Sequence, residues 1–150
     1  MEVFFVRHGE SEANLYGFYA GQKDCPLTLK GEVQAVELGK KLSIVKPFDL
    51  VIVSDLGRTK RTVELLNHGC KNVVLTPLLR ERCWGKIEGH APREFGYPRG
   101  FEDEDYAFDS ERVVACDIEP LKNVSERACK VISSFKGKKF KRVLLVGSEI

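Results

Sequence analysis

Near its start the chain reads Val3-Phe4-Phe5-Val6-Arg7-His8-Gly9-Glu10-Ser11, an apolar run joined directly to an arginine and a histidine. An apolar run without alternation is typical of a strand buried in a parallel sheet. Arginine carries a fork of fixed positive donors that suits phosphate oxygens. Histidine offers a nitrogen that is nucleophilic and neutral near pH 7, and the glycine lets other groups approach closely. Placed together after a strand, they predict phosphoryl transfer to a histidine.

Three further apolar runs alternate with segments of helical periodicity. Strands are expected at residues 50–53, 73–75 and 143–146, and helices at 28–42, 54–66 and 120–135. Thr28 is the expected N-cap of the first helix, and Ser54 and Asp55 should cap the second. The apolar stripes expected to face the core are Val33, Val36, Leu38 and Leu42 in the first helix and Val124, Ala128, Val131 and Ile132 in the last. Residues 9–28 should form a long loop, and residues 78–118 show little periodicity. This order predicts an α/β fold with a mainly parallel sheet.

The composition is that of an ordinary globular protein. The chain has 150 residues, of which 43% are hydrophobic and 31% charged, with a net charge of +2. A single domain over residues 1–150 is therefore expected. No apolar run approaches the roughly 18 residues of a membrane span, and the acidic run at 102–105 disfavours a nucleic-acid partner. Five cysteines without a CxxC spacing predict reduced thiols in the cytoplasm, with neither a zinc site nor a disulfide framework.

Polar residues follow several of the predicted strands directly. Arg7-His8, Ser54-Asp55 and Gly147-Ser148 each come after an apolar run. In open parallel sheets the site lies beyond the carboxyl ends of the strands, so these pairs should meet at one edge. Arg58 lies one turn into the helix that follows the second strand, where it and the free helix amides could face an anion. A solvated surface arginine is the alternative.

Glu81 is the candidate general acid. It follows the third predicted strand among apolar residues, and a carboxyl group in such surroundings keeps its proton for a leaving alkoxide. A surface ion pair with Arg80 or Arg82 is the alternative. In the long loop, Asn14 and the backbone near Gly21 could offer amide donors to phosphate, or they are plain loop residues.

Taken in order, these motifs closely resemble those of the histidine phosphatase superfamily, the phosphoglycerate-mutase-like enzymes. The matching segments are Arg7-His8-Gly9-Glu10-Ser11-Glu12, Ser54 with Arg58, Arg61 and Thr62, Glu81-Arg82-Cys83-Trp84-Gly85, and Val124-Ser125-Glu126-Arg127. They span essentially the whole chain. The resemblance implies a three-layer fold, in which helices cover both faces of a mainly parallel central sheet. It also implies a metal-independent, cofactor-free phosphatase of small phosphorylated substrates.

The resemblance implies roles for individual residues. His8 would attack phosphorus and form a phosphohistidine, Glu81 would protonate the leaving oxygen, and water would then discharge the enzyme. The implied phosphate ligands are Arg7, Asn14, Gly21 and Arg58. These positive side chains would supply the charge stabilisation that Mg²⁺ provides in other phosphoryl-transfer enzymes.

The chain departs from the family at its far end. Family members carry a second histidine after the last core strand, where this chain has Ser148, so Ser148 is expected among the phosphate ligands. A donor of this kind is typically worth about 10²–10³ in rate. The chain also stops earlier than most family members, which predicts an apolar edge that a partner subunit in a homodimer could cover. Mutase-type phosphotransfer and catalytically impaired binding of phosphate esters remain the alternatives to hydrolysis.

Overall fold

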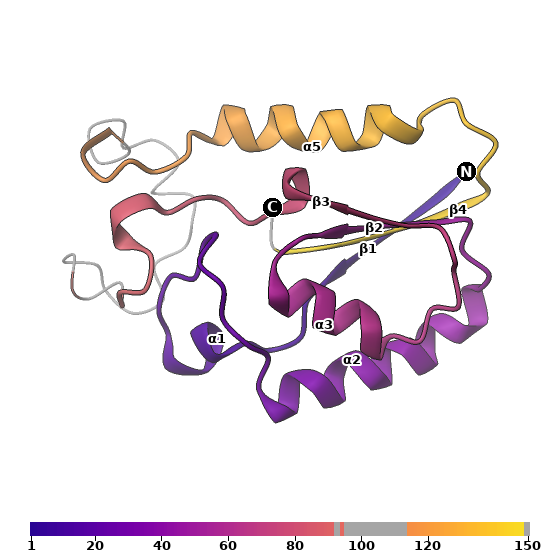
Figure 1. The fold of residues 1–150 in the computed structure, drawn as a ribbon, viewed down its shortest axis with the longest axis horizontal. Coiled ribbons are helices and arrows are strands. Elements are labelled where there is room, and N and C mark those ends of the chain that lie inside the picture. The colour runs from indigo at the N-terminus through magenta and orange to yellow at the C-terminus, as the bar shows by residue number, and fades with distance from the viewer. Residues whose placement is uncertain (92–93, 95–113, 149–150) are drawn as a thin grey trace.

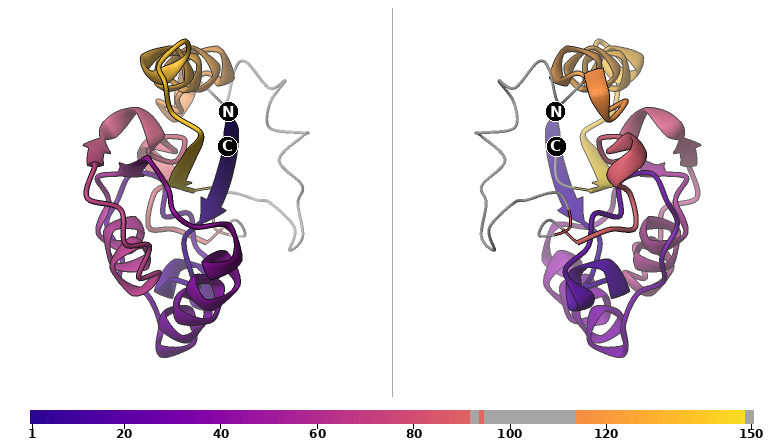
Figure 2. Two further views of the ribbon diagram at one scale, coloured as in Figure 1. Left: turned by 90° about the vertical axis from the view of Figure 1, so that its right-hand side faces the viewer. Right: turned by 90° about the vertical axis from the view of Figure 1, so that its left-hand side faces the viewer.

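Helices cover both faces of a four-stranded parallel sheet, which confirms the expected three-layer α/β architecture (Figure 1). The structure is a computed structural model that describes residues 1–91, 94 and 114–148. Its strands are β1 (Glu2–Arg7), β2 (Leu50–Ser54), β3 (Val73–Thr76) and β4 (Arg142–Gly147), in the order β1-β4-β2-β3. Helix α5 (Leu121–Phe135) lies on one face, and α2 (Leu29–Leu42) and α3 (Gly57–Leu65) lie on the other. Figure 2 shows the same layers end-on.

The two central strands carry the core, and the two outer strands do not. Every residue of β2 is buried, as are the last five residues of β4. In contrast, Val3 and Phe5 of β1 are each 47% exposed, and all three apolar residues of β3 are exposed. The buried setting predicted for residues 3–6 is therefore wrong for Val3 and Phe5, whereas the strand predicted at 73–75 is confirmed as β3. A strand at the sheet edge lacks a neighbour on one side, which composition alone does not reveal.

Helix α2 approaches α3 through small residues. Its buried residues are Gly31, Ala35 and Gly39, and a Cβ on Gly39 would lie 2.3 Å from the Leu66 carbonyl oxygen just after α3. Val33 and Val36 are exposed, so the predicted stripe is wrong for these two valines, whereas Leu38 and Leu42 do pack against the core. The Thr28 cap is confirmed, since its side chain accepts a hydrogen bond from the Gly31 amide at 3.0 Å.

Helix α3 receives its cap from a distant segment. Neither Ser54 nor Asp55 caps it, because Ser54 ends β2 and Asp55 pairs with Arg80. Instead, the Asp24 carboxylate accepts hydrogen bonds from the Gly57 amide at 2.9 and 3.1 Å. A carboxylate there also interacts favourably with the helix dipole. The cap thus ties the loop after β1 to the start of α3.

The segments expected to be irregular contain short helices. Helix α1 (Glu12–Tyr16) interrupts the loop at 9–28, with Ser11 as its N-cap and Asn14 completing a capping box. Among the described residues, 3₁₀ turns follow at η1 (Ser43–Val45), η2 (Pro77–Leu79) and η3 (Gly85–Ile87). The acidic run at 102–105 lies outside the described residues.

Helix α5 presents an apolar face to the sheet. Its buried residues are Val124, Val131 and Phe135. Ile132 is half exposed, so the apolar stripe predicted for this helix is wrong at Ile132. Within the described part of the chain, no helix combines the length and the apolar character needed to cross a bilayer.

Candidate active site

The carboxyl ends of the strands meet at one edge of the sheet, as the sequence predicts. Arg7 pairs in register with Gly147, and the His8 amide donates to the Gly147 carbonyl at 3.0 Å. A cavity of about 170 Å³ opens at this edge. It is lined by Arg7, His8, Ser11, Ala13, Asn14, Phe18, Tyr19, Ala20, Arg58, Glu81 and Trp84.

His8 is held in one tautomer, with the proton on Nδ1 and the lone pair on Nε2. Its side chain is buried, and Nδ1 lies 2.7 Å from the Gly9 carbonyl oxygen. Because a carbonyl only accepts, Nδ1 carries the proton and Nε2 carries the lone pair. Burial lowers the pKa of His8 to about 4, helped by the charges of Arg58 and Arg7 and opposed by the bond to Gly9. The imidazole is therefore neutral and nucleophilic at pH 7.

Arg58 lies at the centre of the site and is fully buried. Its Nε donates to His8 Nε2 at 3.2 Å, and its Nη2 donates to a Glu81 carboxylate oxygen at 2.9 Å. Nη2 also donates to the Gly21 carbonyl at 2.7 Å, and Nη1 donates to the Lys23 carbonyl at 3.0 Å. The alternative of a solvated surface arginine is thereby excluded. A buried guanidinium with these partners is fixed in position where anionic oxygens can reach it.

Glu81 sits beside this arginine and is partly buried, with a side chain 23% exposed. Burial raises the pKa of Glu81, against the opposing effects of Arg58 and of the Trp84 indole N–H at 3.4 Å. The alternative partners are engaged elsewhere: Arg80 pairs with Asp55 at 2.6 Å, and Arg82 donates to the Glu119 carbonyl at 2.7 Å. A carboxyl group that holds its proton more tightly than usual is suited to act as a general acid.

The remaining predicted ligands lie at or beside the cavity. Arg7 and Asn14 line it, and the side-chain Oδ1 of Asn14 also accepts hydrogen bonds from the Ser11 amide and hydroxyl at 3.0 and 2.8 Å. Gly21 is not among the lining residues, and its carbonyl accepts from Arg58. Ser148 is fully buried, with its hydroxyl oxygen 3.5 Å from Arg58 Nη2. Ser148 is also not among the lining residues, so its contact with the cavity runs through Arg58, and its role as a phosphate ligand stays a prediction.

Three acidic or basic residues support the site without having been assigned a role from the sequence. Glu88 accepts hydrogen bonds from the backbone amides of Gln22, Lys23 and Trp84, joining the loop after α1 to the segment that carries Glu81. Asp24 caps α3, and Arg127 of α5 reaches the backbone at Glu81. Each acts across a long stretch of sequence, and no local pattern signals such a contact.

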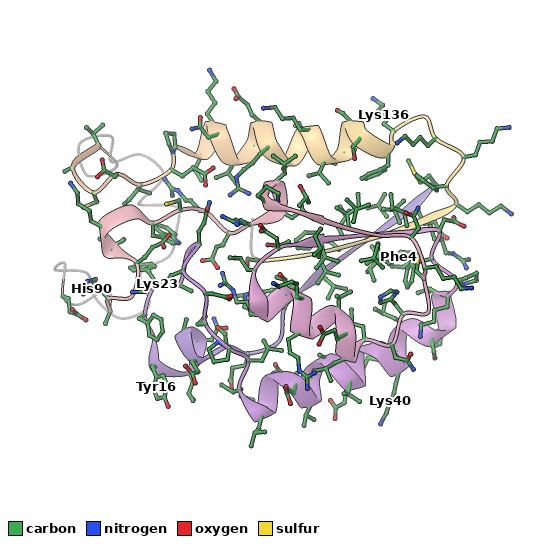
Figure 3. All side chains as sticks on the ribbon, viewed as in Figure 1. Phe4, Tyr16, Lys23, Lys40, His90 and Lys136 are labelled. Atoms are coloured by element: carbon green, nitrogen blue, oxygen red, sulfur yellow. The ribbon has the colours of Figure 1, made fainter. Side chains whose placement is uncertain are left out.

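No group of His, Cys, Asp and Glu in the described ranges has the arrangement of a metal site. Of the other two histidines, His68 accepts from the Cys70 amide, and His90 pairs with Glu94 at 2.9 Å. Neither lines the cavity. Figure 3 shows His90 at the periphery, beside Lys23 and away from the sheet.

Comparisons with known proteins match the whole described fold. A family model described as the histidine phosphatase superfamily (branch 1) matches residues 3–149. Over 89 residues the chain is 43% identical to a Cronobacter sakazakii protein named "Probable phosphoglycerate mutase GpmB", a match that covers 59% of this chain and 41% of the relative. The matched part is thus less than half of the length of that relative.

The fold of this chain is also similar to that of solved structures. The alpha-ribazole phosphatase from Shigella flexneri superposes with a TM-score of 0.80 at 26% identity, covering 99% of this chain and 74% of that one. The YhfR protein of Bacillus stearothermophilus gives a TM-score of 0.78 at 26% identity, covering 98% and 73%.

Proposed function

This chain belongs to the histidine phosphatase superfamily, and on that premise we propose that it hydrolyses phosphomonoesters of a small phosphorylated metabolite through a phosphohistidine on His8. The observation that carries the proposal is the contact of a buried neutral imidazole with a buried guanidinium. His8 Nε2 is 3.2 Å from Arg58 Nε, and Glu81 lies at the same guanidinium in the same cavity. This arrangement supplies a nucleophile, a positive charge and an acid within one small volume.

The first step transfers the phosphoryl group to the enzyme. The Nε2 lone pair of His8 attacks phosphorus, the Nε2–P bond forms, and the bond from phosphorus to the leaving oxygen breaks. Glu81 gives its proton to that oxygen, so an alcohol leaves. Arg58 and Arg7 neutralise the charge on the transferring oxygens, with Asn14 as a further donor.

The second step restores the enzyme. Water attacks the phosphohistidine, the Glu81 carboxylate takes a proton from that water, and the P–Nε2 bond breaks to release inorganic phosphate. Because Nδ1 keeps its hydrogen bond to the Gly9 carbonyl, the imidazole leaves and re-forms in the same tautomer. Ser148 would act at the phosphoryl group through its hydroxyl beside Arg58.

Two observations favour other functions strongly enough to be tested. Similarity to a protein named as a phosphoglycerate mutase favours phosphate transfer between two hydroxyls of one substrate. Ser148 at the position expected for a second histidine favours an impaired enzyme that binds phosphate esters without turnover.

The five cysteines are all free, which supports a reducing, cytoplasmic setting for any of these functions.

The test is phosphate release from a panel of small phosphomonoesters without added metal. We expect release by the parent chain and none by His8→Ala, while His68→Ala retains the parent rate because His68 does not line the cavity. Equal release by the parent and His8→Ala would contradict the mechanism. Rearranged ester without free phosphate would identify a mutase, and competitive phosphate binding without turnover would identify a binding protein.

A further inference from the structure

Glu81 lies in a stretch of backbone without regular secondary structure. Residues 81–84 belong to no helix or strand, between the turns η2 and η3. Ladder hydrogen bonds therefore do not fix the position of the proposed general acid. A carboxyl group that must reach a leaving oxygen within about 3 Å needs its backbone held by other contacts.

Arg127 of α5, which is distant in the sequence, supplies such contacts. Its Nη2 donates to the Glu81 carbonyl at 3.0 Å, and its Nη1 donates to the Leu78 carbonyl at 2.9 Å and to the Arg80 carbonyl. One guanidinium therefore binds three carbonyls on the approach to Glu81 and at Glu81 itself. The planar fork of arginine can bind several acceptors at once, which a lysine ammonium on a flexible stem cannot do with the same geometry.

Glu119 contacts both Arg127 and the backbone of Cys83, which follows Glu81 in the sequence. Its two carboxylate oxygens accept from Arg127 Nε at 2.8 Å and from Nη2 at 3.0 Å. The same carboxylate accepts from the Cys83 amide at 3.0 Å, and the Glu119 amide donates to the Cys83 carbonyl at 2.8 Å. Both side chains are largely buried, at 11% and 14% exposure, so the pair is shielded from solvent screening.

We propose that Arg127 and Glu119 form a positioning pair that sets the Glu81 carboxyl at the distance from the leaving oxygen that proton transfer requires. Neither residue lines the cavity, so the pair acts through the backbone on both sides of Glu81. The inference rests on the proposed function, because it assigns the pair to the proton that Glu81 donates. Misplacing a reacting group by about 1 Å can cost about 10²-fold in rate.

The experiment compares two substrates that differ in their need for an acid. An alkyl phosphate such as glycerol phosphate has a strongly basic leaving oxygen that must be protonated, whereas p-nitrophenyl phosphate releases a weakly basic phenolate. For Arg127→Gln we expect kcat/KM, which reports phosphoryl transfer to His8, to fall by about 10²-fold on the alkyl ester and to change little on the aryl ester. Hydrolysis of the phosphohistidine is common to both esters and does not enter kcat/KM. Glu119→Gln, which keeps an acceptor for the guanidinium, should show the same split with a smaller loss.

Arg142→Gln is the matched control. Arg142 also pairs with a carboxylate, that of Glu2 at 2.7 Å, but at the opposite end of the sheet. We expect it to keep the parent rate on both esters. Equal losses of kcat/KM on both esters in the two test variants would overturn the proposal, since a merely structural role lowers both values alike. If Arg127→Gln does not fold, the split in Glu119→Gln decides the question.

Failure of the proposed function itself would look different. In that case the parent would release phosphate from neither ester, or His8→Ala would match the parent. Hydrogen exchange of the amides at 80–84 then tests the pair directly. Faster exchange in Arg127→Gln than in Arg142→Gln would support the positioning of this segment, and unchanged exchange would overturn it.

Discussion

Replacing His8 by asparagine should remove about 2 kcal/mol of acid sensitivity from the free energy of unfolding. The His8 side chain is only 7% exposed, and burial with the charges of Arg58 and Arg7 lowers its pKa from 6.5 to about 4. Between these two values the unfolded chain binds a proton that the folded chain does not. The free energy of unfolding must therefore decrease as pH falls through 6.5, and the His8 contribution levels off below about pH 4.

The magnitude follows from the width of this window. When the pH is lowered from about 7 to about 5, about one and a half units of this range lie below the unfolded pKa. Each of these pH units lowers the free energy of unfolding by about 1.4 kcal/mol. The assay is urea unfolding of the parent and of His8→Asn at several pH values in this range. Asparagine keeps an amide donor that can reach the Gly9 carbonyl, so the variant should fold.

The comparison variant is His68→Asn. Burial and Lys46 also lower the pKa of His68, but its side chain is only partly buried, so its removal should take away a smaller part of the pH dependence. If His8→Asn and the parent lose stability in parallel between about pH 7 and about pH 5, the reasoning is refuted. The folded chain would then accept a proton on His8 as readily as the unfolded chain does.

Three further changes test other parts of the structure. Asp24→Ala should lower the free energy of unfolding by about 1 kcal/mol in urea titration, because it removes the cap on the Gly57 amide; an unchanged midpoint would contradict the cap. Gly39→Val should cost about 1–3 kcal/mol by the same measurement, since its Cβ would meet the Leu66 carbonyl at 2.3 Å; full stability would show that α2 can move away freely. Ser148→His should raise the rate of phosphate release by up to about 10²-fold by adding a donor beside the guanidinium; a folded variant with the parent rate would place Ser148 away from the phosphoryl group.

Much of the site could be predicted because its residues follow the ends of strands. His8 directly follows β1 and Ser148 directly follows β4, and a parallel sheet brings such positions to one edge whatever the loops do. Arg58 and Glu81 meet at this edge for the same reason, since each comes shortly after a strand, but their ion pair was not predicted from the sequence. The family resemblance then gave roles to positions that local chemistry left open.

Most of the features that escaped prediction depend on distant contacts, although the Ser11–Asn14 capping box of α1 is local. The cap of α3 comes from Asp24, and Arg127 reaches carbonyls more than forty residues away. Exposure of Val33 and burial of Gly39 depend on how closely α2 meets its neighbour, which hydrophobic periodicity does not encode. The sequence pattern of one segment indicates its secondary structure, whereas these contacts depend on how two distant segments pack together.

The strand order also dictates when the active site can exist during folding. β4 follows the other strands in sequence but lies between β1 and β2 in space. Until it inserts, β2 can pair only with β3, and β1 has no partner among the described strands. Because such non-local pairing is slow to form, we expect β2 to pair with β3 before β1 pairs with β4, since β2 and β3 lie closer together in the sequence. His8 follows β1 and Arg58 follows β2, so we expect the contact between their side chains to form only once β4 joins the two strands.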